Sequence, residues 1–227
     1  MHVTLKKRIE PPIYLLGATH IDPISTFRYL GVVISSDLTW NSHVDAIVSR
    51  ANRLLGFIRL VARGASSNSI FCLYKALVLP LLEYGIPAWH PMTCSQENKL
   101  ERIQRTATRI ALKQARGVMP YNERLRSLNW YTLASRRDYL LCSFAMKCLY
   151  GLCNCSALLD NMLINPRCPH TLSFRHLPSR TNTLFFSPSR RLPRLWDTLP
   201  ISVKDEAVIS SLSSFLRVSK TAILDSS

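Results

Sequence analysis

The chain has 227 residues, of which 47% are hydrophobic, and its mean hydropathy is +0.06. A chain of this length and composition can bury a hydrophobic core, which excludes an intrinsically disordered polypeptide. Its 29 Lys and Arg against 14 Asp and Glu give a formal charge of +15. This charge favours a polyanionic partner, with nucleic acid ahead of an anionic membrane surface.

The sequence contains no apolar run long enough to span a bilayer, since the LVLPLL stretch at residues 77–82 is short and includes a proline. The first residues are polar and basic, and no signal-peptide core follows them. The seven cysteines are an odd number, which favours reduced thiols in the cytoplasm or the nucleus. We therefore expect an intracellular protein without a membrane partner.

Short β-strands are predicted first, within residues 13–33. The stretches IYLLG and FRYLGVVI are rich in aromatic and β-branched residues, and Gly17 and Pro23 interrupt them. This pattern indicates a small hairpin or an edge element, which is too small to be stable on its own.

A long amphipathic helix is predicted next, with Ser42 and Asp45 as its capping box. Its apolar residues recur at helical spacing. They are Val44, Ile47, Val48, Ala51, Leu54, Leu55 and Ile58. Ser67 is predicted to cap a second helix, which prolines and Gly85 break or kink.

A third helix is predicted from Thr93 or Ser95 to about Gly117, and a broken helix or a helix pair from residue 121 to 151. In residues 154–200 Pro, Ser and Arg are frequent and helical periodicity is lost, so we expect an extended, loop-rich chain there. A short helix from residue 207 to about 224 follows. The predicted fold class is therefore mainly α with a small N-terminal β-hairpin (α+β), a helical bundle and a loop-rich C-terminal region.

The third helix carries the clearest functional pattern. At about 100° per residue, its apolar residues share one face. Five basic residues lie within a narrow sector on the opposite side: Arg102, Arg105, Arg109, Lys113 and Arg116. Like charges at this spacing repel by a few tenths of a kcal/mol, so the stripe is either a solvated surface or one that contacts phosphates. The overall charge favours phosphates, and Arg50 and Arg53 are candidates for a second row of contacts.

No pattern in the sequence indicates catalysis or metal binding. Two-metal nucleic-acid enzymes need clustered carboxylates, whereas the acidic residues here are scattered, and the adjacent pair Asp205 and Glu206 is expected to stabilise the start of a helix. A zinc site would need unusual ligand spacings. Its candidate ligands are Cys148, Cys153, Cys155, Cys168 and His170. We expect no catalytic residue, bound metal, cofactor or small-molecule substrate.

Several motifs follow one another in a recognisable order. The first are Y-L-G-V at residues 29–32, L-x-W-x-x-H at 38–43 and A-x-x-L-L at 51–55. LYKALVLPLLEYGIPAW, LERIQRTATRIAL, LNWYTLASRRDYLLCSFAMKCLYG and RLWDTLPISV come after them. Together they resemble the end of the reverse transcriptase domain, and the tail behind it, of non-LTR (LINE-type), jockey-like retrotransposons.

The resemblance implies a part of a polymerase whose catalytic palm, with its metal-binding aspartates, lies upstream of residue 1. The family's A-D-D turn does not occur in this sequence. By resemblance, Tyr29, Leu30 and Gly31 correspond to the hairpin that supports the primer end, and the following helices to the thumb that grips the duplex. The implied partners are the backbone of RNA, DNA or an RNA–DNA hybrid, and the missing palm domain.

The resemblance also implies four regions. They are a palm remnant with the primer-grip-like hairpin (1–40), a helical thumb-like region (41–117), a helical continuation (118–153) and a loop-rich region with a short terminal helix (154–227). The expected function is nucleic-acid binding without sequence preference and without polymerase activity. Two alternatives stay open: an RNA-directed DNA polymerase, and an inert or protein-interaction remnant whose exposed apolar face once packed against the palm.

Overall fold

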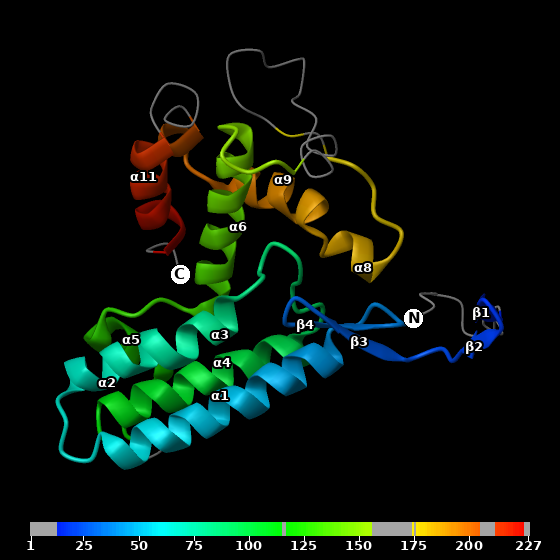
Figure 1. The fold of residues 1–227 in the computed structure, drawn as a ribbon. Coiled ribbons are helices and arrows are strands. Elements are labelled where there is room, and N and C mark those ends of the chain that lie inside the picture. Colours follow the sequence, from blue (N-terminus) through cyan, green and yellow to red (C-terminus); the bar gives the residue numbers. More distant parts are fainter. Residues whose placement is uncertain (1–12, 115–116, 156–173, 175, 205–211, 225–227) are drawn as a thin grey trace.

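The computed structural model describes residues 13–114, 117–155, 174, 176–204 and 212–224 (Figure 1). These residues are mainly helical, with two small antiparallel strand pairs at the N-terminal end, which confirms the predicted mainly α fold with a small N-terminal β-hairpin. Within these ranges, every helix is too short or too polar to cross a membrane.

Four short strands form two hairpins, where the sequence predicted one. They are β1 (Tyr14–Leu16), β2 (Thr19–Ile21), β3 (Thr26–Tyr29) and β4 (Val32–Ser35). β1 pairs with β2 and β3 pairs with β4, both antiparallel. Leu30 and Gly31 form the two-residue turn between β3 and β4, with φ of 45° and 86°. Positive φ at both central residues is typical of the type I′ turn, whose twist suits a hairpin.

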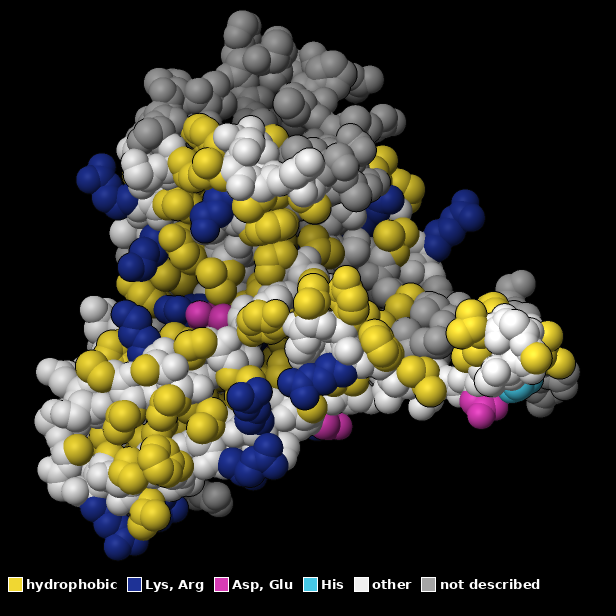
Figure 2. All heavy atoms as spheres, viewed as in Figure 1, with side chains coloured by type: hydrophobic (Ala, Val, Ile, Leu, Met, Phe, Trp, Pro, Cys, Tyr) yellow, Lys and Arg dark blue, Asp and Glu magenta, His cyan; other side chains and the backbone are white. Residues whose placement is uncertain are grey.

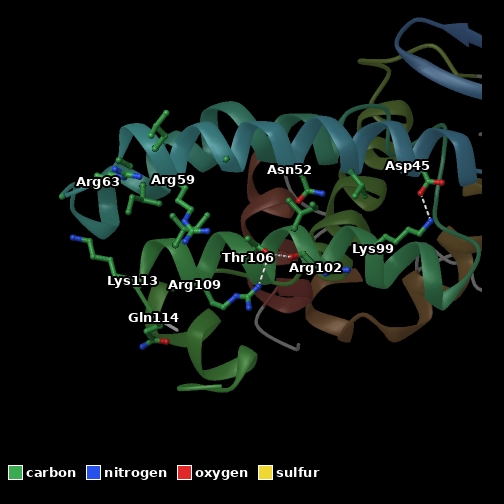
Figure 3. A pocket seen from close by; sticks show the side chains of 18 residues that line it. Asp45, Asn52, Arg59, Arg63, Lys99, Arg102, Thr106, Arg109, Lys113 and Gln114 are labelled. Carbon is green, nitrogen blue, oxygen red and sulfur yellow. Dashed lines mark hydrogen bonds and ion pairs between the residues drawn. The ribbon is translucent and has the colours of Figure 1, made fainter. Parts of the chain in front are cut away.

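A lower bundle of helices follows the hairpins. Its elements are α1 (Asn41–Val61), α2 (Ser67–Leu73), the π-helical segment η1 (Tyr74–Val78), α3 (Leu79–Glu83), α4 (Cys94–Ala111) and α5 (Tyr121–Leu128). α1 and α4 lie side by side and run in the same direction (Figure 3). Their buried residues form the lower core, and they include Val44, Ile47, Ala51, Leu55 and Ile58 of α1 and Leu100, Ile103, Ala107 and Ala111 of α4. The predicted stripe of α1 is thus confirmed, although Val48 and Leu54 are only partly buried.

The helix ends differ in part from the prediction. Thr93 caps α4 as predicted, since its hydroxyl accepts a hydrogen bond from the Gln96 amide at 3.2 Å. Ser66 rather than Ser67 caps α2. The predicted capping box of α1 is wrong, because the helix already begins at Asn41 without a side-chain cap, and Asp45 forms an ion pair with Lys99 instead.

A second core lies above the first and shares α6 (Leu133–Leu149) with it (Figure 1). It is formed with α9 (Pro188–Thr198) and α11 (Leu212–Leu224), and the short helix α8 (Asn182–Phe185) precedes α9. Trp196 and Phe215 stack at its centre, with ring centroids 6.0 Å apart. The expectation of an extended chain is wrong for residues 182–198, which form α8 and α9. Most of the remainder of 154–181 lies outside the described residues.

Three consecutive charged residues of α6 connect the two cores. Arg136 forms two hydrogen bonds with Glu83 of α3, and Arg137 donates to Glu97 of α4 at 3.1 Å. The third, Asp138, pairs with Arg191 of α9. Because each partner belongs to a different helix, these ion pairs fix the orientation of α6 against both cores.

The β3–β4 hairpin is held on the lower bundle by an aromatic cluster. The Val33 amide donates to Nδ1 of His43 at 3.1 Å. His43 is buried and packs edge-on against Trp89, with ring centroids 4.6 Å apart. At the hairpin turn, the Tyr84 hydroxyl donates to the Leu30 carbonyl at 2.8 Å. β1 and β2 are exposed along their whole length.

Tyr84→Phe should weaken the hold on β3–β4 selectively. Losing one hydrogen bond costs about 0.5–1.5 kcal/mol, so amide exchange should become faster at residues 32–35 and stay unchanged in α1. Tyr14→Phe, which removes a hydroxyl from the exposed strand β1, is the matched control. Amides of β1–β2 should exchange faster than those of β3–β4 in every variant. Protection of β1–β2 equal to that of α1 would contradict this account.

Acid should destabilise the fold through His43. Burial, with Arg28 adding to it, lowers the pKa of His43 from 6.5 to about 4. The unfolded chain therefore binds a proton that the folded chain does not, and stability is lost as the pH falls from about 6.5 towards 4, by about 3 kcal/mol at most. His43→Asn keeps an acceptor for the Val33 amide but does not titrate. Chemical denaturation at pH 7, 6, 5 and 4 should show a shallower pH dependence in this variant, whereas identical curves would contradict the assignment.

Candidate nucleic-acid interface

A groove runs between α1 and α4 on the outside of the lower bundle (Figure 3). Its volume is about 1250 Å³. Six basic side chains line it: Arg59 and Arg63 from the α1 side, and Lys99, Arg102, Arg109 and Lys113 from the α4 side. Asp45 is the single acidic side chain in its lining.

Helical spacing explains why these residues face the groove. Arg102 and Arg109 are seven residues apart and so project from one side of α4, whereas Arg59 projects from α1 and Arg63 from the turn that follows α1. Lys113 follows two residues after α4 ends and has a φ of 53°. This left-handed residue turns the chain at the end of the helix. The predicted continuation of the helix to Gly117 is therefore wrong.

The groove has an excess of positive charge. Lys99 is paired with Asp45 at 2.6 Å at one end, and both side chains are about half exposed. Thr106 accepts a hydrogen bond from Arg109 at 3.2 Å and so orients that guanidinium. Within the described residues, acidic partners are absent for Arg59, Arg63, Arg102 and Lys113.

The two acidic residues of α4 do not reduce this charge, because their partners lie elsewhere. Glu97 pairs with Arg137 of α6. Glu101 is buried and accepts hydrogen bonds from the Tyr121 hydroxyl and from the Leu133 amide. Burial raises the pKa of Glu101, and the hydrogen bond from Tyr121 opposes that rise.

The structure divides the seven basic residues singled out in the sequence. Arg102, Arg109 and Lys113 line the groove. Arg105 is exposed with its guanidinium 5.1 Å from the Tyr121 ring centroid, on the side of α5. Arg50 and Arg53 are exposed on α1 and do not line the groove, and Arg116 lies outside the described residues.

The sequence interpretation missed Arg59, Arg63 and Lys99. The signal for Arg59 and Arg63 was present, since they are four residues apart and lie off the buried stripe of α1. What the sequence did not reveal is that this side of α1 lies beside the basic side of α4, which is a tertiary contact.

The residues matched to a primer grip lie at the opposite end of α1 from Arg59. Tyr29 ends β3 and is 60% exposed, Leu30 is 73% exposed, and Gly31 completes the turn. A Cβ atom at Gly31 would come within 3.3 Å of the Tyr84 ring, so glycine also serves the contact between the turn and the bundle.

The described residues include no group of three His, Cys, Asp or Glu that could hold a metal ion. Cys148 is buried in the second core, and burial raises the pKa of its thiol. Cys168, His170, Asp205 and Glu206 lie outside the described residues.

No protein-family model and no solved structure matches the chain. Over 110 residues the chain is 27% identical to the probable RNA-directed DNA polymerase from transposon X-element of Drosophila melanogaster. The aligned part is 47% of this chain and only 12% of that polymerase. This similarity supports a relationship to the reverse transcriptases of retrotransposons.

Proposed function

We propose that this chain is the thumb and downstream part of a non-LTR retrotransposon reverse transcriptase, and that it binds the backbone of RNA, DNA or an RNA–DNA hybrid. The groove between α1 and α4 is the proposed binding surface. The observation that carries the proposal is the lining of this groove, where six basic side chains meet one acidic side chain. The similarity to the X-element polymerase supports the assignment to this class of proteins.

The chemistry of the groove favours contacts with phosphates. Its lining contains no aromatic side chain on which a base could stack, while Asn52 and Thr106 add polar groups between the cations. Arg102 and Arg109 are seven residues apart, which is about 10 Å along a helix. Basic side chains at this spacing can each contact a different phosphate. Because phosphate contacts carry no sequence information, binding should have little sequence preference.

The same cations also have a role without any ligand. Arg59 and Arg109 lie in the last turns of α1 and α4, where basic side chains favour the negative end of the helix dipole. Each such interaction contributes about 0.3–1 kcal/mol to stability. Binding and stability must therefore be measured separately in any groove variant.

Replacing Arg59 and Arg102 by Gln should weaken nucleic-acid binding. If about four or five phosphates are neutralised, log K should fall against log salt with a slope of about −3.6 to −4.5 for a duplex. The double variant should flatten this slope by about 1.8 and weaken binding equally for unrelated sequences. Fluorescence anisotropy with labelled duplexes, from low salt upwards, measures both quantities.

The matched control is Arg50→Gln combined with Arg53→Gln, which removes the same charge from exposed positions outside the groove. It should change the slope by less than half as much as the groove variant. An equal effect of the two pairs would show that net charge rather than the groove determines binding. Thermal unfolding of both variants checks that the fold is retained.

We further propose that this chain does not polymerise by itself, and that a palm domain supplying clustered aspartates is its partner. Two-metal catalysis needs several carboxylates around the ions, and the acidic residues Glu83, Glu97 and Asp138 are each engaged by an arginine.

The purified chain should not extend a labelled primer on an RNA or a DNA template with Mg²⁺ or Mn²⁺. An active reverse transcriptase added to the same mixture is the positive control, and it shows that the template and buffer permit synthesis. Nucleotide incorporation that co-elutes with the chain through two different chromatographic steps would overturn the proposal.

A further inference from the structure

Apolar side chains are exposed on α1 away from the basic groove. Phe57 and Val61 are 52% and 51% exposed and lie one helical turn apart. Leu54, one turn before Phe57, is partly buried against the lower core. Leu77 of η1, a segment that contacts α1, is 37% exposed. These four residues, from here on the apolar patch, belong to two adjacent helical segments.

Helical spacing separates the apolar patch from the groove. Residues 54, 57 and 61 share one side of α1, while residues 52 and 59 share another. The second set lines the groove against α4, and the apolar patch does not include any of it. Figure 2 shows hydrophobic side chains gathered over the C-terminal part of α1 and over α2. α1 thus has a basic side towards the groove and an exposed apolar side away from it.

The border of the apolar patch is basic and lacks acids. Arg53 and Arg50 precede Phe57 by four and seven residues, so they continue the same side of α1. Residues 46–82 contain four Arg and one Lys but neither Asp nor Glu. The acids that flank this segment in sequence, Asp45 and Glu83, pair with Lys99 and with Arg136.

We propose that the apolar patch is a docking site for an acidic amphipathic helix of a partner protein. A surface formed by two adjacent helices accepts the ridge of a third helix, whose apolar side chains recur at three and four residues. Charge complementarity requires acidic residues on that helix where it passes Arg50 and Arg53. The two arginines also disfavour a second copy of this chain, because a symmetric contact would bring like charges together.

Other occupants fit less well. A patch with three exposed apolar side chains is small for a bilayer, since membrane affinity scales with the buried apolar area. The side chains of Phe57, Val61 and Leu77 have no hydrogen-bond donor for the phosphates of a nucleic acid. The inference does not depend on the proposed nucleic-acid binding, because the groove lies on another side of α1.

The probe is a fluorescent peptide of about 18 residues, five helical turns, with Leu at helical spacing on one side and Glu elsewhere. The control peptide has the same composition with its Leu residues spread over all sides. We expect the full chain to bind the probe about tenfold more tightly than the control. Phe57→Gln with Val61→Gln should remove that preference, whereas Arg59→Gln with Arg102→Gln should retain it.

Four results would overturn the proposal. Equal affinity for the two peptides would show that charge alone accounts for binding. An unchanged preference in the Phe57→Gln, Val61→Gln variant would show that the apolar patch is not the binding site. Self-association that this variant abolishes would assign the apolar patch to a second copy. Binding to phosphatidylserine-containing vesicles that this variant abolishes, without preference between the peptides, would assign it to a membrane. Both substituted residues are half exposed, so circular dichroism should confirm a retained fold.

Discussion

The close contact between α1 and α4 is the constraint on which the rest of the lower bundle depends. Ala51 on α1 and Ala107 and Ala111 on α4 are fully or almost fully buried. Such small side chains let two helices approach closely, and Leu100 and Ile103 fill the space beside them. With their apolar sides committed to this contact, the two helices must carry their long basic side chains along its outer edge. The basic groove is thus a consequence of core packing.

The orientation of the two cores relative to each other depends on buried charged residues, whose desolvation costs free energy. Arg137 is 2% exposed, and burial lowers the pKa of its guanidinium while raising the pKa of the Asp138 carboxyl. The ion pairs with Glu97 and Arg191 oppose both shifts. Buried ion pairs add little net stability, but removing one partner leaves an unpaired buried charge. The arrangement therefore penalises any other orientation of α6.

Sequence periodicity was sufficient to predict the core residues of a helix that buries one side, as for Leu100, Ile103 and Ala107. It failed where single residues take uncommon conformations. Lys113, two residues after α4, and Leu30, in a hairpin turn, both have left-handed backbone conformations, although neither residue type favours that conformation. The helix α9 was missed because its prolines resemble helix breakers.

The structure shows why the first proline of α9 is tolerated. Pro188 lies in the first turn, where its missing N–H costs nothing, whereas Pro193 lies inside the helix and is buried. The candidate site was also predicted only in part. Periodicity identified the basic side of α4, but only tertiary structure could add the facing residues of α1. The same tertiary structure shows that Arg105 faces α5.

Contacts that join distant parts of the chain determine when each part of the bundle can form. The pairs Leu30–Tyr84, Asp45–Lys99 and Glu83–Arg136 are separated by 54, 54 and 53 residues. Closing such loops costs conformational entropy and slows folding. During synthesis α1 is complete long before α4 leaves the ribosome. Until then η1 and α3 can cover only part of the apolar stripe of α1, and the part that packs against α4 is uncovered. A nascent or truncated chain that ends before residue 94 therefore exposes the apolar side chains of α1 that α4 would cover, which favours chaperone binding and aggregation.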